Sequence, residues 1–163
     1  MLNPVTNVVI AGLGGQGVLR ASDILADVAV RGGFDVKKSE IKGMSQRGGS
    51  VSSDVRFGNQ VLSPMVTPGE ADYLLVLEPT QVDPNRHMLK PRGLLITPDA
   101  VNADQLPNRK SLNVALLGAL SAHLPLAEAA WLDALREAFP AEFFEANRRA
   151  FLIGRNARST DAT

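Results

Sequence analysis

The chain has 163 residues, 45% of them hydrophobic and 21% charged, which is the composition of one globular domain with its own apolar core. Seventeen Lys and Arg balance seventeen Asp and Glu, so the charge gives no reason to expect nucleic acid or an anionic membrane as a partner. The absence of cysteine excludes disulfides, thiolate zinc sites and cysteine-bound iron–sulfur clusters. Any redox metal must therefore be held by another chain.

The first residues, MLNPVTNVVIAG, carry no targeting signal. No basic stretch precedes the apolar run, and a glycine ends the run after a few residues. We therefore expect a cytoplasmic protein.

The first fifty residues contain nine of the fourteen glycines, so unusual backbone conformations are expected there. Residues 7–11 form a short β-branched run that predicts a strand. Apolar residues at helical spacing predict a helix from Val18 to Val28, with Gly32 and Gly33 as its C-cap. Residues 34–39 then predict a second strand beside the first, which completes a βαβ unit.

Three further strands are predicted in the middle of the chain. Residues 50–57 alternate between apolar and polar, and Gly58-Asn59 follows where a tight hairpin turn is expected. The apolar runs 73–77 and 94–97 predict central strands buried on both faces. The segments that follow these two runs, 79–90 and 101–108, are polar, and we expect short or irregular helices there.

Helices are predicted for the rest of the chain. Residues 111–124 are apolar nearly all round, which indicates burial against more than one neighbour. Pro125 is expected to open the next helix, and a last helix is predicted from Ala141 to Ile153 with Gly154 as its cap. The whole pattern predicts an α/β fold, a Rossmann-like three-layer sandwich with a mostly parallel sheet and a small antiparallel hairpin. Residues 1–154 form one domain in this interpretation, and 155–163 form a disordered tail.

The turn GLGGQG at residues 12–17 matches the dinucleotide fingerprint G-x-G-x-x-G after a strand and before a helix. Glycines permit a tight turn and close approach of a pyrophosphate, and the helix N-terminus attracts an anion. Glu40 stands where an acid that binds a ribose is expected. One interpretation is therefore a freestanding NAD- or FAD-binding oxidoreductase or a nucleotide-sensing domain.

A second glycine-rich loop, KGMSQRGG at residues 42–49, has no counterpart in an ordinary dinucleotide fold. The chain also offers no recognisable acid–base set for a dehydrogenase, and the ATP-binding motif G-x-x-x-x-G-K-[ST] is absent. Another phosphate ligand, or a loop that only packs against a partner protein, is the alternative that these residues leave open.

Together the two loops, GLGGQGV and SEIKGMSQRGGSVSSDVRFG, resemble the gamma subunit or domain of the 2-oxoacid:ferredoxin oxidoreductases, most closely the small subunit of the indolepyruvate type. The stretches SLNVALLGAL and FFEANRRAFLIG extend the resemblance over residues 7–154. It implies a Rossmann-like subunit without catalytic residues that packs on a thiamine- and iron–sulfur-bearing catalytic subunit and shapes the coenzyme A entrance.

The resemblance further implies that the assembled complex converts a 2-oxoacid to an acyl-coenzyme A and passes electrons to ferredoxin or a similar acceptor. Thiamine diphosphate, the clusters and coenzyme A belong to the complex, and none is expected to bind this chain alone. The absence of cysteine agrees with that division independently.

Ten residues are the candidate site, all of them in the two glycine loops. They are Gly12, Gly14, Gly15, Gln16, Gly17, Ser45, Gln46, Arg47, Gly48 and Gly49.

Each polar candidate also has a purely structural interpretation. Arg47 either forks onto a phosphate or carboxylate or forms an ion pair between subunits. Gln16 reaches a ligand or caps the helix start. Glu40 is expected to form a hydrogen bond that anchors its loop rather than one to a ribose. Asn113 is expected to be structural, with its amide bonded to neighbouring backbone.

Overall fold

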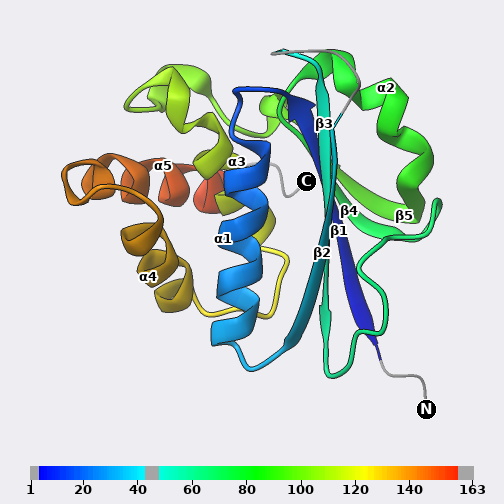
Figure 1. Cartoon of the computed structure of the whole chain (residues 1–163). Helices are drawn as coiled ribbons and strands as arrows, with labels where there is room; N and C mark the ends of the chain where they lie inside the picture. The colour runs from blue at the N-terminus through cyan, green and yellow to red at the C-terminus, as the bar shows by residue number, and fades with distance from the viewer. Residues whose placement is uncertain (1–3, 43–47, 158–163) are drawn as a thin grey trace.

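A five-stranded mixed sheet in the order β2-β3-β1-β4-β5 forms the centre of the fold (Figure 1). The computed structural model describes residues 4–42 and 48–157. The strands are β1 (Val5–Leu13), β2 (Asp35–Lys42), β3 (Ser50–Gly58), β4 (Ala71–Val76) and β5 (Leu89–Ile96). The helices are α1 (Val18–Arg31), α2 (Val82–Asn85), α3 (Leu112–Ser121), α4 (Glu128–Ala138) and α5 (Phe144–Ala157), with short 3₁₀ turns before several of them.

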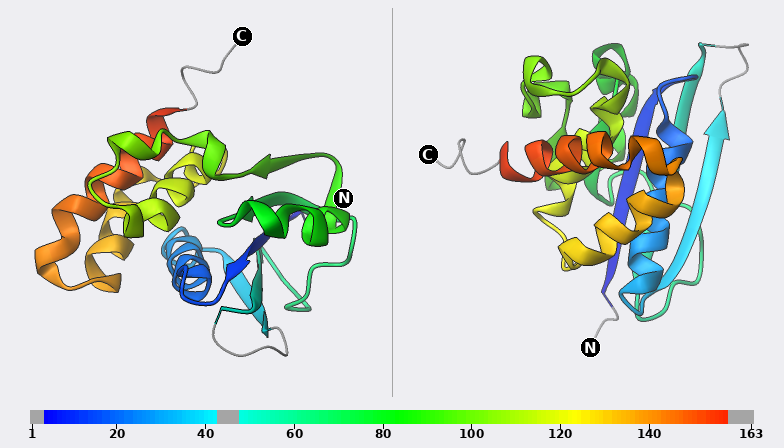
Figure 2. Two further views of the ribbon diagram at one scale, coloured as in Figure 1. Left: turned by 90° about the horizontal axis from the view of Figure 1, so that it is seen from above. Right: turned by 90° about the vertical axis from the view of Figure 1, so that its left-hand side faces the viewer.

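Helices α1, α3, α4 and α5 cover one face of the sheet, and α2 lies on the other (Figures 1 and 2). Alternate residues of β1 enter the two resulting cores, because successive side chains of a strand point to opposite faces. Val8 and Ile10 pack with the large helical core, whereas Val9 and Ala11 pack with Val66 and other residues on the α2 side. The predicted three-layer α/β sandwich is confirmed.

The prediction of a mostly parallel sheet is wrong in one half of the sheet. β1 pairs with β4, and β4 with β5, in parallel. β3 lies between β1 and β2 and runs antiparallel to both. The second strand is therefore not beside the first, and the hairpin partner of β3 is β2 rather than a strand after Gly58-Asn59. Likewise β5 is an edge strand and not a central one.

Helix α1 follows its sequence prediction closely. Its inner stripe includes Ala21, Leu25 and Val28, and each of these is fully buried. At its end the Gly32 N–H donates to Val28 O and the Gly33 N–H to Val30 O, with Gly33 at φ +86°. The predicted glycine C-cap is thus confirmed.

The C-terminal helices differ from the prediction at their boundaries. Helix α3 is buried on all sides, as its apolar composition predicts. Helix α4 begins at Glu128, three residues after Pro125, and α5 continues to Ala157 through the glycine predicted to cap it. Gly154 lies inside α5. The position requires glycine because a Cβ there would come 1.7 Å from the Ala115 carbonyl oxygen of α3. The glycine permits close helix packing and does not end the helix. Residues 158–163 of the predicted tail lie outside the described residues.

One carboxylate is buried on the α2 side of the sheet. Asp54 of β3 is 3% exposed, and its Oδ2 accepts a hydrogen bond of 2.9 Å from the Val66 N–H. Burial raises the pKa of Asp54, although the Val66 hydrogen bond and the nearby Arg56 charge lower it. The carboxylate ties the irregular segment after β3 to the sheet.

Candidate functional site

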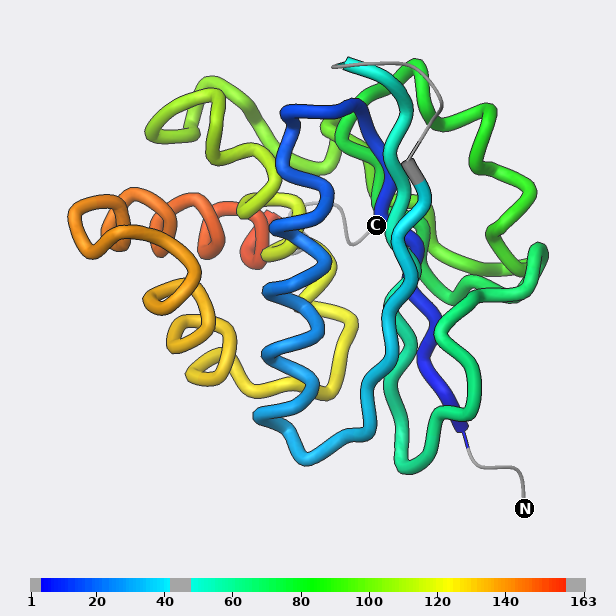
Figure 3. The backbone as a smooth tube through the Cα atoms, viewed as in Figure 1, coloured from blue at the N-terminus to red at the C-terminus, as the bar shows by residue number. Residues whose placement is uncertain are grey.

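The two glycine loops meet at the end of the sheet where β1, β2 and β4 have their carboxyl ends. β2 runs parallel to β1 because both are antiparallel to β3, and β4 also runs parallel to β1. The turn after β1 and the start of β3 therefore lie at the same end of the molecule (Figure 3). Ligands of open α/β sheets bind at this end of the strands. Of the candidate residues, Ser45, Gln46 and Arg47 lie outside the described residues.

A backbone hydrogen bond joins the two loops directly. The Gly14 N–H donates to Gly49 O at 2.8 Å. A Cβ at position 14 would lie 3.2 Å from the Gly48 backbone nitrogen, closer than most real contacts. Positive φ is found at Gly15, Gly17 and Gly48 but not at Gly14. Gly14 is thus needed for the close approach of the second loop, and the two loops form one composite surface.

The glycines on either side of the turn also have structural reasons. Gly12 is buried, and a Cβ there would meet Gln16 Oε1 at 2.8 Å and Val18 Cγ2 at 2.9 Å. Gly17 has φ +86° and the side chain of Asn113 above it, with Asn113 Nδ2 2.4 Å from a built Cβ. The Asn113 amide donates to Gly17 O at 3.4 Å, which confirms the structural role predicted for it.

The side chain of Gln16 is held by the protein itself. Its Oε1 accepts from the Leu13 N–H at 2.7 Å, and its Nε2 donates to Glu78 Oε2 at 3.2 Å. Glu78 follows β4, so this contact links the turn after β1 to the end of the neighbouring strand. Nearby, Ser50 Oγ donates to Gln81 Oε1 at 2.9 Å. Gln16 therefore has a structural role, but it stabilises the turn rather than caps α1.

Sequence reasoning did not identify Glu78 and Gln81 as neighbours of the glycine loops. The only signal was the position of Glu78-Pro79 directly after a predicted strand. In an α/β sheet, residues at the carboxyl ends of adjacent parallel strands lie side by side. Assignment of the strand order from the sequence would have placed Glu78 beside Gln16.

The structure does not support the dinucleotide interpretation. Glu40 lies on β2, and β3 separates β2 from β1, which places the acid about 10 Å from the β1 backbone at a strand spacing of ~4.8 Å. The Lys38 ammonium donates to the Glu40 carboxylate at 2.7 Å. In addition, the amides of Gly14 and Gln16 already donate to Gly49 O and Leu13 O, so they are not free for a pyrophosphate.

The described part of the chain offers neither a metal-binding cluster nor a membrane-spanning helix. Residues 4–42 and 48–157 contain no group of three His, Asp or Glu side chains that could hold a metal ion. Nor is any helix within those ranges long and apolar enough to cross a membrane. Of the two histidines, His123 provides its carbonyl oxygen to the Tyr73 hydroxyl at 3.2 Å.

Comparison with known proteins shows the family. The family described as pyruvate ferredoxin/flavodoxin oxidoreductase matches residues 7–157. The indolepyruvate oxidoreductase subunit IorB of Thermococcus kodakarensis is 34% identical, over 91% of this chain and 93% of the relative. The 2-oxoglutarate synthase subunit KorC of Archaeoglobus fulgidus is 30% identical, over 91% of this chain and 85% of the relative.

Solved structures share the fold. The gamma subunit of a keto/oxoacid ferredoxin oxidoreductase from Geobacter sulfurreducens superimposes with a TM-score of 0.79 at 24% identity, over 96% of this chain and 98% of that one. A 2-oxoglutarate:ferredoxin oxidoreductase from Magnetococcus marinus gives 0.80 at 19% identity, over 98% of this chain and 32% of that one. The fold thus occurs both as a separate subunit and as part of a longer chain.

The chain is therefore an α/β protein of the small-subunit type, with a composite glycine-loop surface at one end of its sheet. It belongs to the pyruvate ferredoxin/flavodoxin oxidoreductase family, with small or gamma subunits of 2-oxoacid:ferredoxin oxidoreductases as its relatives. The resemblance found in the sequence is confirmed.

Proposed function

We propose that the chain is the gamma-type subunit of a thiamine-diphosphate-dependent 2-oxoacid:ferredoxin or similar oxidoreductase, and that its two glycine loops face the catalytic subunit at the coenzyme A entrance. The assembled enzyme releases carbon dioxide from a 2-oxoacid, forms an acyl-coenzyme A and passes two electrons to the acceptor. Thiamine diphosphate and iron–sulfur clusters supply that chemistry on other subunits. This chain contributes a surface.

The side-chain chemistry supports this division of labour. A chain with no cysteine cannot hold a cysteine-ligated iron–sulfur cluster. The IorB relative, which is named as an oxidoreductase subunit, is matched over 93% of its own length. The Magnetococcus marinus structure contains coenzyme A, which supports coenzyme A as the ligand of such a complex.

The hydrogen bond from Gly14 to Gly49 is the observation that carries the proposed surface. It joins the turn after β1 to the loop that contains Ser45, Gln46 and Arg47, so the two motifs act as a unit. A buried packing role is excluded for Gly15, because it is exposed and a Cβ there would meet nothing within 4 Å. Gly15 and Gly48 are exposed, and Gly48 follows Arg47 in the sequence, so this part of the surface suits a phosphate group of coenzyme A or an acidic side chain of the partner.

We propose that the 2-oxoacid substrate of the complex is indolepyruvate or a related arylpyruvate. The two IorB subunits matched over 91% of this chain are 34% and 30% identical, KorC is 30% identical and the pyruvate/ketoisovalerate gamma subunit of Pyrococcus furiosus is 26% identical. Matches to two further IorB subunits reach 44% and 47% over shorter parts of the chain. A panel of 2-oxoacids assayed with the purified complex tests this part. Faster turnover of pyruvate or 2-oxoglutarate than of indolepyruvate would contradict it.

Steady-state kinetics of the complex at varied coenzyme A test the surface itself. Arg47→Ala is expected to weaken either coenzyme A binding, seen as a higher KM, or assembly. The expected loss of binding free energy is ~1.5–3 kcal/mol, which is the usual effect of losing a hydrogen bond to a charged group. Arg47→Lys is expected to restore part of the loss, because an ammonium cannot form the bidentate contact of a guanidinium. Arg149→Ala, on the exposed face of α5, is the matched control. Unchanged kinetics and unchanged assembly for Arg47→Ala would refute the proposed role.

A further inference from the structure

The two edges of the sheet differ in their ability to pair with another strand. β5 contains Pro91, and Arg92 in the same strand has the left-handed φ of 67°. Its pairing with β4 is also irregular between Ala71 and Tyr73. Proline and an irregular register both prevent an edge strand from accepting a partner. The β5 edge is therefore blocked.

The β2 edge is regular along its whole length. Its eight residues, DVKKSEIK, include neither proline nor glycine, and they pair with β3 in one unbroken register. No other strand of the described residues pairs with its outer side, and β2 is the outermost strand of the sheet (Figure 2, right). An edge of this kind presents a row of backbone donors and acceptors to another strand.

We propose that β2 pairs antiparallel with β2 of a second copy of this chain, about a two-fold axis at Ser39, so that two sheets join into one. When two identical strands pair antiparallel, the two-fold axis that relates them is perpendicular to the sheet. Rotation about this axis leaves each side chain on the same face of the sheet. Residues that face each other must therefore share a face, which limits the axis to positions that coincide with a residue.

Strand overlap and charge together select Ser39. An axis at Val36 or Ile41 also pairs opposite charges, but it overlaps only residues 35–37 or 40–42 of each β2, whereas an axis at Ser39 overlaps residues 36–42. An axis at Ser39 places each Lys38 opposite Glu40 of the second copy, so two attractive pairs form. An axis at Lys37, Lys38 or Glu40 places that residue opposite its own copy, and like charges directly opposite each other are destabilising. Charged edge strands usually resist pairing. Here the extent of strand overlap and the charges together favour one register.

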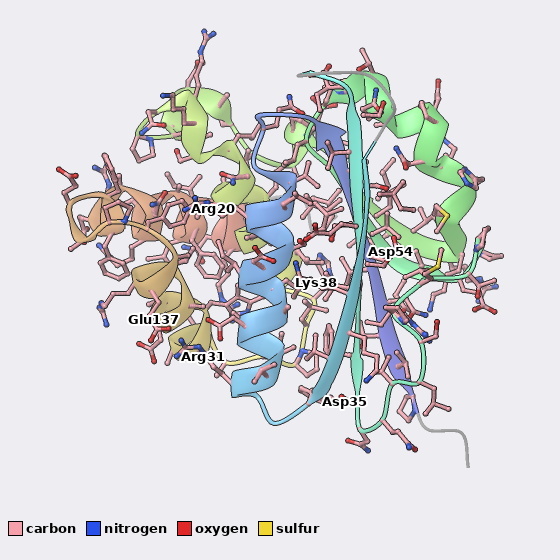
Figure 4. All side chains as sticks on the ribbon, viewed as in Figure 1. Arg20, Arg31, Asp35, Lys38, Asp54 and Glu137 are labelled. Carbon is pink, nitrogen blue, oxygen red and sulfur yellow. The ribbon has the colours of Figure 1, made fainter. Side chains whose placement is uncertain are left out.

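Side-chain positions on the edge agree with this register. Lys38 extends from β2 toward α1 (Figure 4), where it bonds Asp23 and Glu40, and its side chain remains 30% exposed. On the other face Ile41 is 51% exposed, an unusual exposure for an isoleucine. The proposed register lays the aliphatic stem of Lys37 from the second copy over Ile41. Both the exposed charge and the exposed apolar group thus gain a partner.

Single-cysteine crosslinking tests the register, because the natural chain has no cysteine. In the proposed pair the two Ser39 Cα atoms lie about 4.5–5.5 Å apart, within the range of a disulfide. The two Lys37 Cα atoms lie about 13 Å apart, as do the two Ile41 Cα atoms. Mild oxidation is expected to crosslink Ser39→Cys with itself, to leave Lys37→Cys and Ile41→Cys alone as monomers, and to crosslink those two variants when they are mixed.

Light scattering on the purified full chain measures the association without a crosslink. We expect the mass to rise from 17.4 kDa toward twice that value as the concentration increases. Glu40→Lys is expected to lower the association constant by ~2- to 30-fold, and Lys38→Glu combined with Glu40→Lys to restore it, since two exposed ion pairs are lost and re-formed. Arg149→Glu, a charge reversal at an exposed position of α5 away from β2, is the control and keeps the association within about twofold.

Two results would overturn the proposal. One is a mass that stays at that of the monomer together with no crosslink at Ser39. The other is equal crosslinking of all three cysteine variants, which indicates random collision rather than one register. A crosslink of Lys38→Cys with itself in place of Ser39→Cys would refute the register.

Discussion

Replacement of Gly14 by valine tests whether the two glycine loops form one surface. A Cβ at this position would lie 3.2 Å from the Gly48 nitrogen and 3.7 Å from Gly49 O, and the two methyl groups of valine need still more space. Overpacking of this kind costs about 1–3 kcal/mol, and lengthening of the Gly14 N–H bond to Gly49 O costs about 0.5–1.5 kcal/mol. Because Gly14 is only half-buried, relaxation keeps the expected total at ~1–3 kcal/mol.

Thermal unfolding and complex assembly are the two readouts. For a chain of this length ~1–3 kcal/mol lowers the Tm by about 2–12 °C. Gly33→Ala, at the C-terminal end of α1, is the matched control, because φ +86° strains an alanine by ~1–2 kcal/mol although its Cβ meets nothing within 4 Å. Gly14→Val is expected to weaken assembly with the catalytic subunit, and Gly33→Ala to lower only the Tm. If Gly14→Val changed neither the Tm nor assembly, the contact between the loops would not matter.

Three other predictions concern single side chains. Gly154→Ala is expected to destabilise the chain by ~2 kcal/mol or more in chemical unfolding, because its Cβ would overlap Ala115 O; helix propensity alone predicts a gain of ~1 kcal/mol, so a gain would refute the packing argument. Asp54→Asn keeps an acceptor for the Val66 N–H and removes a buried charge. Since the folded pKa of Asp54 is raised, the contribution of Asp54 to stability is present at acid pH and is lost as pH rises through that pKa. The variant is therefore expected to gain stability relative to the natural chain at neutral pH and not at acid pH, and equal effects at both would contradict the assignment. Arg47→Ala is expected to leave the Tm unchanged, and a lower Tm would indicate a structural role.

The sequence predicts the individual elements of this fold better than their neighbours. Helix α1, its glycine cap and all five strands follow from apolar spacing and turn residues, since these signals are local. The position of β3 between β1 and β2 does not, because alternation in residues 50–57 shows a half-buried strand but not which strands flank it. The same limit explains the hairpin expected at Gly58-Asn59.

Glycines show the same limit at the level of single residues. Gly33 and Gly154 each follow an apolar helical stretch, and the sequence predicts a helix end at both. Only Gly33 has a positive φ and ends its helix, whereas Gly154 allows α5 to contact α3. The difference depends on Ala115 of α3, which lies 154 − 115 = 39 residues away in sequence, so it cannot be derived locally.

The candidate site divides in a similar way. The two motifs and their glycines are evident in the sequence, and so is the structural role of Asn113. The contact from Gly14 to Gly49 and the contact from Gln16 to Glu78 depend on strand order, which the motifs do not contain.

Reconstitution with and without this chain tests the central claim most directly. The tagged chain is purified together with its thiamine- and cluster-bearing partner, and reduction of a viologen dye is measured with indolepyruvate and coenzyme A. We predict dye reduction by the complex, none by this chain alone, and a loss of coenzyme-A-dependent activity when the chain is removed that its return restores. Full activity of the partner without this chain, or activity of this chain alone, would contradict the account.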